Sequence, residues 1–393
     1  MAEHSRRIFI STGEVSGDLQ GALLIEALVQ RSRDRHLTLE ITALGGPRMA
    51  RAGAKLVGET TGIGSVGIFE ALPYLMPTLR LQRLAKAALD AQPPDLAVLI
   101  DYMNPNLVMG DYLKTHHPQV PVVYYIAPQQ WVWAFSEKDT RRLVQCSDRM
   151  LAIFKAEADY YRGFGANTTW VGHPLVDRYP GPADQAAARQ QLGLPLDTPV
   201  VTLLPASRQQ EVKYLMPVLL QAAQIIQARC PEATFLLPVS IPALRASFEQ
   251  GLAAHGLNGR VVAEGSQGAI AAADVAITKS GTANLEIALM DVPQVVAYRI
   301  HPLSARIARY LLKFDVPYVS PVNLVVNQPV VPEFLQWEAT PAAIAAAALE
   351  LLHSETARQT MRSGYARVRE ELGPPGVCQR TADLILDALD ETP

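Results

Sequence analysis

The sequence predicts an α/β protein with two doubly wound parallel-sheet domains that face each other across a cleft. Two observations predict this fold class. Short β-branched runs alternate with longer helical patterns over most of the 393 residues, which favours parallel sheets with crossover helices. A stretch rich in proline and glycine, 172–182, separates two such series and is typical of an interdomain linker. A chain of this length can give each domain its own core.

The strands are expected in two series, one on each side of this linker. We expect an N-terminal domain over 1–172, a C-terminal domain over 173–365, and helices over 366–393 that pack back on the N-terminal domain. The last of these helices is expected from about Val377 to Leu389. The expected strands are Ile8–Ser11, Glu40–Leu44, Leu96–Ile100, Val122–Ile126, Met150–Ile153, Thr169–Val171, Val200–Leu204, Phe235–Pro238, Val261–Ala263, Val275–Thr278 and Gln294–Tyr298.

The composition excludes some classes of protein. The net charge of −3 argues against a nucleic-acid binder. No apolar run approaches the roughly 20 residues that span a bilayer. The cysteines, Cys146, Cys230 and Cys378, are far apart and have no metal-ligand spacing, which fits a reducing compartment. We therefore expect a cytoplasmic protein. We also expect no metal and no other cofactor, because the sequence has no P-loop and no Asp-x-Asp pair placed to hold a metal–diphosphate, and its histidines do not cluster like zinc ligands.

The strongest candidate for a binding site is the stretch 273–286. Its pattern predicts a buried strand, a sharp turn at Ser280, Gly281 and Thr282, and a helix that begins near Ala283. The N–H groups at the start of a helix form a cradle for an anion. One helical turn further on, Glu286 could accept hydrogen bonds from sugar hydroxyls. Ser and Thr also cap ordinary helices, so capping is the alternative.

A second feature that suits an anion follows the first strand of the second series. Arg208 has a planar, forked guanidinium that suits a diphosphate, and the backbone around Ser207 supplies N–H donors. An ordinary surface arginine near a helix start is the alternative. The loops after parallel strands meet at one edge of a sheet, so both features are expected in one cleft, where they indicate a ligand with a diphosphate and a ribose.

Two loops of the first domain also carry candidates. The loop 13–18 is expected before a helix from about Leu19, and its two glycines allow close approach of a ligand, although Ser16 or Asp18 could simply cap the helix. The turn 45–49 carries Arg48, which could touch substrate.

Asp101 is the candidate general base. It stands directly after the apolar strand 96–100, where a carboxylate is costly to desolvate unless it is paired or used. The carboxyl end of a parallel strand also faces the ligand crevice. The alternative role is capping of a helix that begins near Pro105, for which Asn104 is better placed.

Apolar and aromatic segments complete the set of candidates. Trp131 offers a flat face to a sugar ring or a lipid, and Gln129 can bond hydroxyls, although tryptophan is equally a core residue. The stretch 63–75 would present an apolar stripe to a membrane interface if helical, or else would face the core. Cationic residues at 306, 309 and 313 favour the membrane, but a solvated helix would look the same.

Taken in order along the chain, these loops resemble the lipid-A-disaccharide synthases, and the resemblance covers nearly the whole chain. Each motif is short, but their shared order is specific. The residues that carry the resemblance are Gly13 to Asp18, Gly46 to Met49, Ile100 and Asp101, Pro128 with Trp131 to Trp133, Gly172 to Pro174, Ser207 and Arg208 with Glu211 and Val212, Ser280 to Thr282 with Leu285 and Glu286, Tyr298 and Arg299, and Pro321 with Asn323 and Leu324.

The resemblance implies a GT-B glycosyltransferase with two Rossmann-like domains. Such an enzyme moves 2,3-diacylglucosamine from UDP to the 6-hydroxyl of 2,3-diacylglucosamine 1-phosphate, with inversion and release of UDP. It is implied to be a homodimer that works as a peripheral protein on the cytoplasmic face of the inner membrane. Asp101 matches the proposed catalytic aspartate. The implied donor residues are Ser207, Arg208, Ser280, Gly281, Thr282, Glu286, Tyr298, Arg299 and Asn323; the implied acceptor residues are Gly13, Glu14, Ser16, Gly17, Asp18, Arg48, Asn106, Pro128, Gln129, Trp131 and His173; and the implied membrane contacts are Val66, Ile68, Phe69 and Leu72.

The chain departs from the family pattern at three of these loops. In the loop before the Trp motif, Gln129 follows Pro128 where the family has Pro-Ser. The family usually continues Ile-Asp-x-Pro-Asp-Phe-Asn, whereas here Met103, Asn104 and Pro105 precede Asn106. Ala206 replaces the glycine of Pro-Gly-Ser-Arg. Two other functions stay open on the sequence: a different UDP-sugar enzyme, such as a UDP-GlcNAc 2-epimerase or a glycosyltransferase for another lipid, and a non-catalytic protein that binds a UDP-sugar or a membrane.

Overall fold

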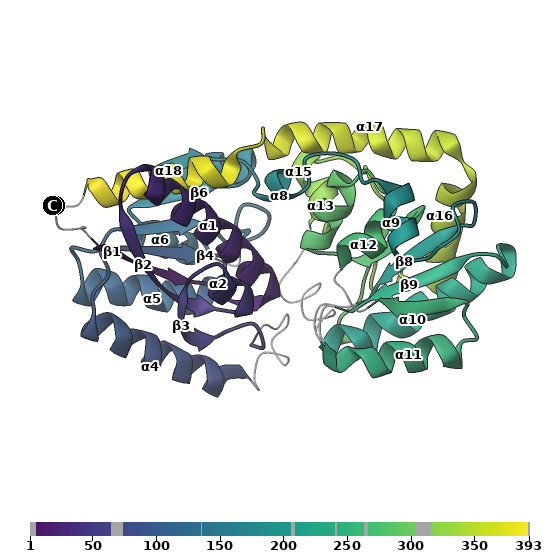
Figure 1. The fold of residues 1–393 in the computed structure, drawn as a ribbon, viewed down its shortest axis with the longest axis horizontal. Coiled ribbons are helices and arrows are strands. Elements are labelled where there is room, and N and C mark those ends of the chain that lie inside the picture. The colour runs from purple at the N-terminus through teal and green to yellow at the C-terminus, as the bar shows by residue number, and fades with distance from the viewer. Residues whose placement is uncertain are drawn as a thin grey trace. The chain divides into compact units, whose positions relative to one another are not determined.

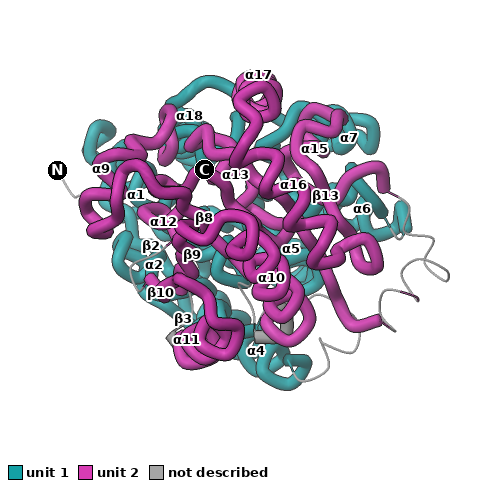
Figure 2. The backbone as a smooth tube through the Cα atoms, turned by 90° about the vertical axis from the view of Figure 1, so that its right-hand side faces the viewer, with its two compact units in different colours: residues 1–177, 372–393 teal, residues 178–371 magenta. Residues whose placement is uncertain are grey.

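The structure, a computed structural model, describes residues 5–63, 74–134, 136–205, 209–239, 242–262, 266–302, 306 and 316–391, with the backbone alone at 209–211 and 242. It divides into two compact units, coloured separately in Figure 2. Unit 1 comprises 1–177 and 372–393, and unit 2 comprises 178–371. The chain therefore crosses between the units twice. The boundaries expected from the sequence, 172/173 and 365/366, fall shortly before these crossings.

Unit 1 contains a parallel sheet of seven strands in the order β3-β2-β1-β4-β5-β6-β7. Strand β4, with the sequence LAVLI, is buried at every residue, as a strand with helices on both faces requires. Strand β3 was not expected, because it is a half-exposed edge strand whose apolar pattern is weak. The strands are β1 Ser5–Ser11, β2 Thr38–Gly45, β3 Lys55–Glu59, β4 Leu96–Ile100, β5 Val122–Tyr125, β6 Arg149–Ala152 and β7 Thr168–Trp170.

Helices cover this sheet and complete its core (Figure 1). Phe9, Leu99 and Tyr124, from three neighbouring strands, are fully or almost fully buried in one apolar cluster. The helices are α1 Glu14–Asp34, α2 Pro47–Arg51, α4 Leu75–Ala91, α5 Met103–His116, α6 Glu137–Gln145, α7 Lys155–Gly163, α8 Leu175–Arg178 and α18 Val377–Asp390.

Unit 2 contains a parallel sheet of six strands in the order β10-β9-β8-β11-β12-β13. The three-residue edge strand β13 was not expected, because it is too short to show a pattern. The strands are β8 Val200–Leu204, β9 Thr234–Pro238, β10 Gly259–Val262, β11 Val275–Lys279, β12 Gln294–Tyr298 and β13 Glu333–Leu335. The helices are α9 Gln185–Gln191, α10 Gln209–Arg229, α11 Arg245–Ala254, α12 Ser266–Ala271, α13 Thr282–Leu289, α15 Pro321–Val326, α16 Pro341–His353 and α17 Glu355–Leu372, with a 3₁₀ turn at Pro242–Leu244.

Each sheet reverses its strand order at one point. In unit 1 the reversal lies between β1 and β4, and in unit 2 between β8 and β11. Right-handed crossovers place the helices that follow these two strands on opposite faces of the sheet, so their loops separate and leave a crevice. Ligands of doubly wound sheets bind at such crevices.

Helix α18 returns the chain to unit 1 and packs on α1 (Figure 1). Asp177 fixes its start, because the Asp177 carboxylate accepts hydrogen bonds from the N–H groups of Gly376 at 2.6 Å, Val377 at 3.2 Å and Cys378 at 2.7 Å. Three otherwise unsatisfied helix N–H groups are thereby paired.

We expect Asp177→Asn to lower the free energy of unfolding of unit 1 by about 1–2 kcal/mol, the cost of a lost helix cap, because an amide nitrogen, which cannot accept a hydrogen bond, replaces one carboxylate oxygen. A Trp337→Phe background leaves only tryptophans 131, 133 and 170, all in unit 1, so urea denaturation followed by their fluorescence measures this unit. Asp159→Asn, at a side chain 75% exposed, is the control. Equal midpoints for both variants would contradict the capping role.

Candidate active site

The buried amide of Asn106 fixes the crevice of unit 1. The Ser11 hydroxyl donates to Asn106 Oδ1 at 2.7 Å, and Asn106 Nδ2 donates to the carbonyl oxygens of Ile100 at 3.0 Å and Asp101 at 2.9 Å. The side chain therefore joins the carboxyl ends of β1 and β4. Asn106 was expected to contact the acceptor, but it is fully buried and its polar atoms are paired, so the structure places it in the scaffold beneath the site.

Asp101 stands exposed above this scaffold with an unusual backbone. Its φ is +46°, and the next residue, Tyr102, has a φ of +49°. Left-handed conformations are rare for residues other than glycine and persist only where the surroundings hold them. Here the Asp101 N–H donates to the Ile126 carbonyl at 2.9 Å, and the Tyr124 hydroxyl donates to the Asp101 carbonyl at 2.8 Å. Helix α5 starts at Met103, two residues before the expected start near Pro105, and its N-cap residue Tyr102 makes no side-chain capping hydrogen bond.

Tyr102 is a part of the crevice that the sequence did not reveal. A Cβ at Gly13 would lie 2.2 Å from Tyr102 Cδ2, so the loop after β1 can approach the loop after β4 only because residue 13 is glycine. The neighbouring Glu14 also has a positive φ, of +63°. Non-glycine residues with positive φ therefore gather where the two loops meet, as is common at functional sites.

The expectation that helix α1 begins near Leu19 was wrong, because the helix begins at Glu14. A Cβ at Gly17 would lie 2.1 Å from Thr12 Oγ1, so this glycine lets the first helical turns pack on the strand end. Ser16 and Gly17 are thus helical residues. Asp18 is 2% exposed and accepts hydrogen bonds from the N–H groups of Arg48 and Met49 at 3.1 and 3.0 Å, so it caps α2 instead of α1.

Arg48 and the residues after β5 lie at further loop ends of unit 1. The Arg48 guanidinium donates to the Val15 carbonyl at 3.3 Å. The Pro128 carbonyl accepts from the Tyr161 hydroxyl at 2.8 Å, whereas Gln129 is exposed. Arg48 therefore links α2 to the first turn of α1, and Gln129 is the amide in this set that solvent can reach.

Trp131 and His173 belong to one aromatic cluster in unit 1. The ring of Phe154 lies 5.6 Å from that of Trp131 and 5.4 Å from that of His173, between centroids. Burial lowers the pKa of His173 to about 3, so its ring is neutral, and Nδ1 accepts the Leu175 N–H at 3.2 Å. The buried Trp131 indole N–H has no acceptor among the described residues.

Glu157 is a buried carboxylate that ties together the ends of β5 and β6. Its two oxygens accept hydrogen bonds from the N–H groups of Ala127 at 2.9 Å, Ile153 at 2.9 Å and Phe154 at 3.2 Å. Burial outweighs these bonds and raises its pKa to about 8. The sequence did not indicate this clamp, because only the tertiary structure brings the two strand ends to one side chain.

At the crevice of unit 2, helix α13 begins at Thr282, one residue before the expected start. Gly281, with a φ of +155°, donates its N–H to Asn284 Oδ1 at 3.0 Å, and the Ser280 hydroxyl donates to the Val319 carbonyl at 2.8 Å. Ser280 and Gly281 thus shape the turn. The N–H groups that a helix start leaves for an anion are those of Thr282 and Ala283.

Glu286, one turn into α13, is half-buried and accepts a hydrogen bond from the Tyr179 hydroxyl at 3.1 Å. The same hydroxyl accepts from Arg178 Nε at 3.1 Å. Arg178 and Tyr179 both come from the segment after the first crossing between the units, far from Glu286 in the sequence, so sequence spacing did not indicate this chain of hydrogen bonds.

The remaining donor candidates are Tyr298 and Arg299 at the end of β12, and Asn323 in helix α15. Asn323 is 1% exposed, and its amide donates to Glu333 Oε1 at 2.6 Å and accepts the Val331 N–H at 2.9 Å, so it too is scaffold. Arg299 Nε donates to the Gln336 carbonyl at 3.0 Å. Tyr298 ends β12 and is half-buried. Predictions for Ser207, Arg208, Val66, Ile68, Phe69 and Leu72 lie outside the described residues.

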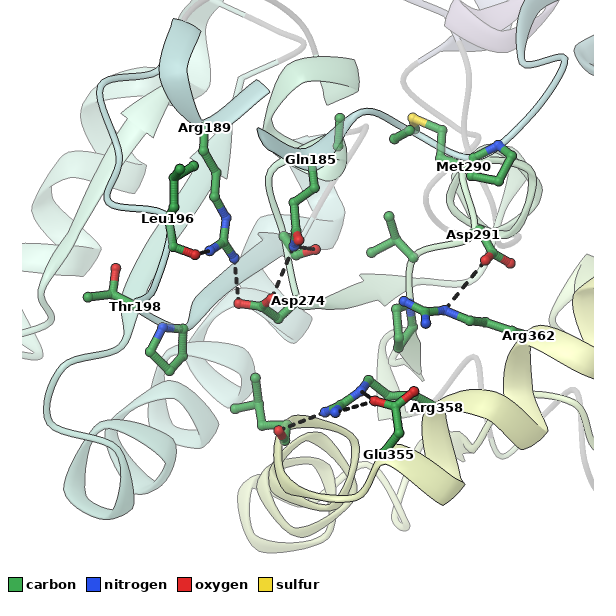
Figure 3. A pocket seen from close by; sticks show the side chains of 18 of the residues that line it. Gln185, Arg189, Leu196, Thr198, Asp274, Met290, Asp291, Glu355, Arg358 and Arg362 are labelled. Atoms are coloured by element: carbon green, nitrogen blue, oxygen red, sulfur yellow. Dashed lines mark hydrogen bonds and ion pairs between the residues drawn. The ribbon is translucent and has the colours of Figure 1, made fainter. Parts of the chain in front are cut away.

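A pocket of about 530 Å³ in unit 2 lies at the amino-terminal ends of the strands, opposite the strand ends that form the crevice (Figure 3). Pro199, Asp274 and Pro293, which directly precede three strands, line it. Its arginines are paired, Arg189 with Asp274 at 2.6 Å and Arg362 with Asp291 at 3.4 Å. None of the donor candidates lines this pocket. Across the described ranges, no three His, Cys, Asp or Glu side chains converge to hold a metal ion, and no helix could span a membrane.

Two parallel sheets with crevices at their points of reversal define the class as the two-domain GT-B fold. CalG4, the calicheamicin glycosyltransferase, shares it with a TM-score of 0.57 and 15% identity, over 98% of this chain and 99% of that chain. A co-structure of S. aureus MnaA with UDP gives a TM-score of 0.66 and 13% identity, over 98% and 97% of the two chains.

A family model described as lipid-A-disaccharide synthetase matches residues 8–387. Lipid-A-disaccharide synthase from Gloeothece citriformis is 52% identical over 97% of this chain and 99% of the relative, and that from Geobacter metallireducens is 34% identical over 98% of each. The chain therefore belongs to the lipid-A-disaccharide synthase family and is a hexosyltransferase that forms a lipid A disaccharide. This result favours the glycosyltransferase over the epimerase and the non-catalytic binder left open by the sequence.

Glu157 predicts a pH dependence of stability. Its pKa in the folded chain lies above the ordinary value of 4.5, so the native state binds the proton more tightly than the unfolded state. The resulting stability is fully present below about pH 4.5 and is lost as the pH rises through about 8. Urea denaturation at several pH values gives the free energy of unfolding across this range. We expect this free energy to fall with pH more steeply in the wild type than in Glu157→Gln, by up to about 1.4 kcal/mol per pH unit. Parallel profiles would contradict the raised pKa.

Proposed function

We propose that the chain transfers 2,3-diacylglucosamine from UDP-2,3-diacylglucosamine to the 6-hydroxyl of 2,3-diacylglucosamine 1-phosphate, with inversion at the anomeric carbon. Membership of the family supports the disaccharide product. The UDP in the co-structure of MnaA, a protein of the same fold, supports a uridine nucleotide as the carrier. The observation that carries the mechanism is an exposed carboxylate, Asp101, held by a strained and tightly bonded backbone at the crevice of unit 1.

In this mechanism Asp101 is the general base. The acceptor oxygen attacks the anomeric carbon from the face opposite UDP and forms the new C–O bond. The bond from that carbon to the diphosphate oxygen breaks, UDP leaves with the electron pair, and the acceptor proton passes to the Asp101 carboxylate. Inversion follows, because attack and departure occur on opposite faces.

The leaving group needs stabilisation of its negative charge, and unit 2 provides candidates for it. We assign this role to Arg208 and to the N–H groups at the start of α13, after Ser280 and Gly281. Glu286 would accept hydrogen bonds from the ribose hydroxyls. In unit 1, the buried indole N–H of Trp131 is a donor suited to an oxygen of the acceptor.

Asp101→Asn should lower turnover by on the order of 10²–10⁴-fold, the usual contribution of a general base, while the affinity for UDP stays unchanged. The assay incubates purified protein with UDP-2,3-diacylglucosamine and the monosaccharide 1-phosphate and detects the disaccharide by mass. Asp159→Asn, at an exposed carboxylate of the same unit, should keep wild-type turnover. Near wild-type rates for Asp101→Asn would remove this residue from the mechanism, and no disaccharide from the wild type would refute the reaction.

We also propose that unit 1 contacts the cytoplasmic face of the inner membrane through 66–72 and the helix α4 that follows. Leu75, Met76 and Leu79 are 56%, 70% and 38% exposed, which is unusual for large apolar side chains. Arg80 and Arg83, spaced to share a helix face with Met76, are also exposed and suit anionic lipid head groups.

The double variant Met76→Ser, Leu79→Ser should lower binding to anionic phospholipid vesicles by at least about tenfold, because two apolar side chains no longer enter the interface. Cosedimentation with vesicles measures this. Leu196→Ser, at a leucine 65% exposed in unit 2, is the matched control. An equal loss in the control would show that α4 has no special part in lipid contact.

A further inference from the structure

Tyr179 is a buried side chain that no step of the proposed reaction uses. It is 4% exposed and is the second residue of unit 2. Its hydroxyl stands between two charged groups: it accepts from Arg178 Nε at 3.1 Å and donates to Glu286 Oε2 at 3.1 Å. The Arg178 guanidinium also lies 5.6 Å from the centre of the Tyr179 ring.

The chemistry of this contact makes Tyr179 a permanent donor to Glu286. Burial, with the nearby Glu286 charge as the next cause, raises the pKa of Tyr179 to about 12, so the phenol keeps its proton at any working pH. A guanidinium that donates to the phenol oxygen strengthens the bond which the phenol donates onward. The bond to the carboxylate is charge-assisted and therefore among the stronger side-chain hydrogen bonds.

The contact also restricts where Glu286 can point. A glutamate on a helix surface has several rotamers of similar energy. Binding a ligand that requires one of these rotamers lowers the side-chain entropy, and this loss weakens the affinity. With Oε2 fixed by Tyr179, the carboxylate still has acceptor capacity for further hydrogen bonds, since its two oxygens offer about four lone-pair sites. Glu286 is thus already oriented before a ligand arrives.

We propose that Tyr179 is a positioning residue that holds Glu286 ready for the ribose hydroxyls of the nucleotide, although Tyr179 itself does not touch the donor. This inference rests on the proposed donor role of Glu286. It adds that the Glu286 carboxylate binds the 2′- and 3′-hydroxyls of the ribose and that the Tyr179 phenol holds this carboxylate in place.

The test compares the affinities for UDP and for 2′,3′-dideoxy-UDP by calorimetry. The wild type should prefer UDP, and Tyr179→Phe should weaken UDP binding by about tenfold while leaving the dideoxy analogue unchanged, because only a ribose with hydroxyls uses Glu286. At saturating donor the turnover of Tyr179→Phe should stay within about twofold of wild type, so the effect falls on KM.

The matched control is Tyr365→Phe. Tyr365 is also a buried tyrosine of unit 2, at 1% exposure, and its hydroxyl donates to the Val292 carbonyl at 3.0 Å. Tyr365→Phe therefore measures the effect of removing a buried hydroxyl that does not bond Glu286. This variant should keep the wild-type preference for UDP. A tenfold loss that affects UDP and the dideoxy analogue equally in Tyr179→Phe would show general damage to unit 2 and overturn the proposal.

Glu286→Gln separates the two hypotheses. If it abolishes the preference for UDP and Tyr179→Phe adds nothing to it, the two residues act as one unit and the proposal holds. If Glu286→Gln abolishes the preference but Tyr179→Phe retains it, Glu286 binds ribose without help and the positioning role is refuted. If Glu286→Gln itself retains the preference, the donor role of Glu286 fails, and the positioning role fails with it.

Discussion

The buried amide of Asn106 is the interaction on which the candidate active site depends. It joins the last residues of β1 and β4, the two strands between which the order of the unit 1 sheet reverses, and one of its bonds goes to the carbonyl of Asp101 itself. An amide can donate and accept at once, so one side chain satisfies strand ends that no sheet partner reaches. This buried contact holds the backbone that carries the exposed carboxylate of Asp101.

The same device recurs at other strand ends, with a different side chain each time. Glu157 gathers the N–H groups after β5 and β6, and Glu333 accepts those of Val319 and Ser320. Asn284 bonds Gly281 and the Lys279 carbonyl in the turn after β11. Loops that carry ligands cannot use the regular hydrogen bonds of a sheet, so buried carboxylates and amides replace them.

This arrangement separates two kinds of residue that short motifs mix. Asp101 and Glu286 keep part of their surface accessible, and we assign them contacts with substrate. Asn106, Asp18 and Asn323 stand in the same motifs but are buried, with their polar atoms bonded to the chain. A motif therefore contains both residues that contact the ligand and buried residues that position them.

The sequence by itself determined the two parallel sheets, because continuous apolar runs such as Leu96–Ile100 are long enough to show burial without knowledge of their neighbours. It also determined the candidates at strand ends, since a parallel sheet brings those ends to one edge. Only the tertiary structure decided that Tyr102 packs on Gly13, that Asp18 caps α2 and that Tyr179 holds Glu286. These contacts join residues from separate segments, and no local periodicity or spacing carries the geometry that brings such segments together.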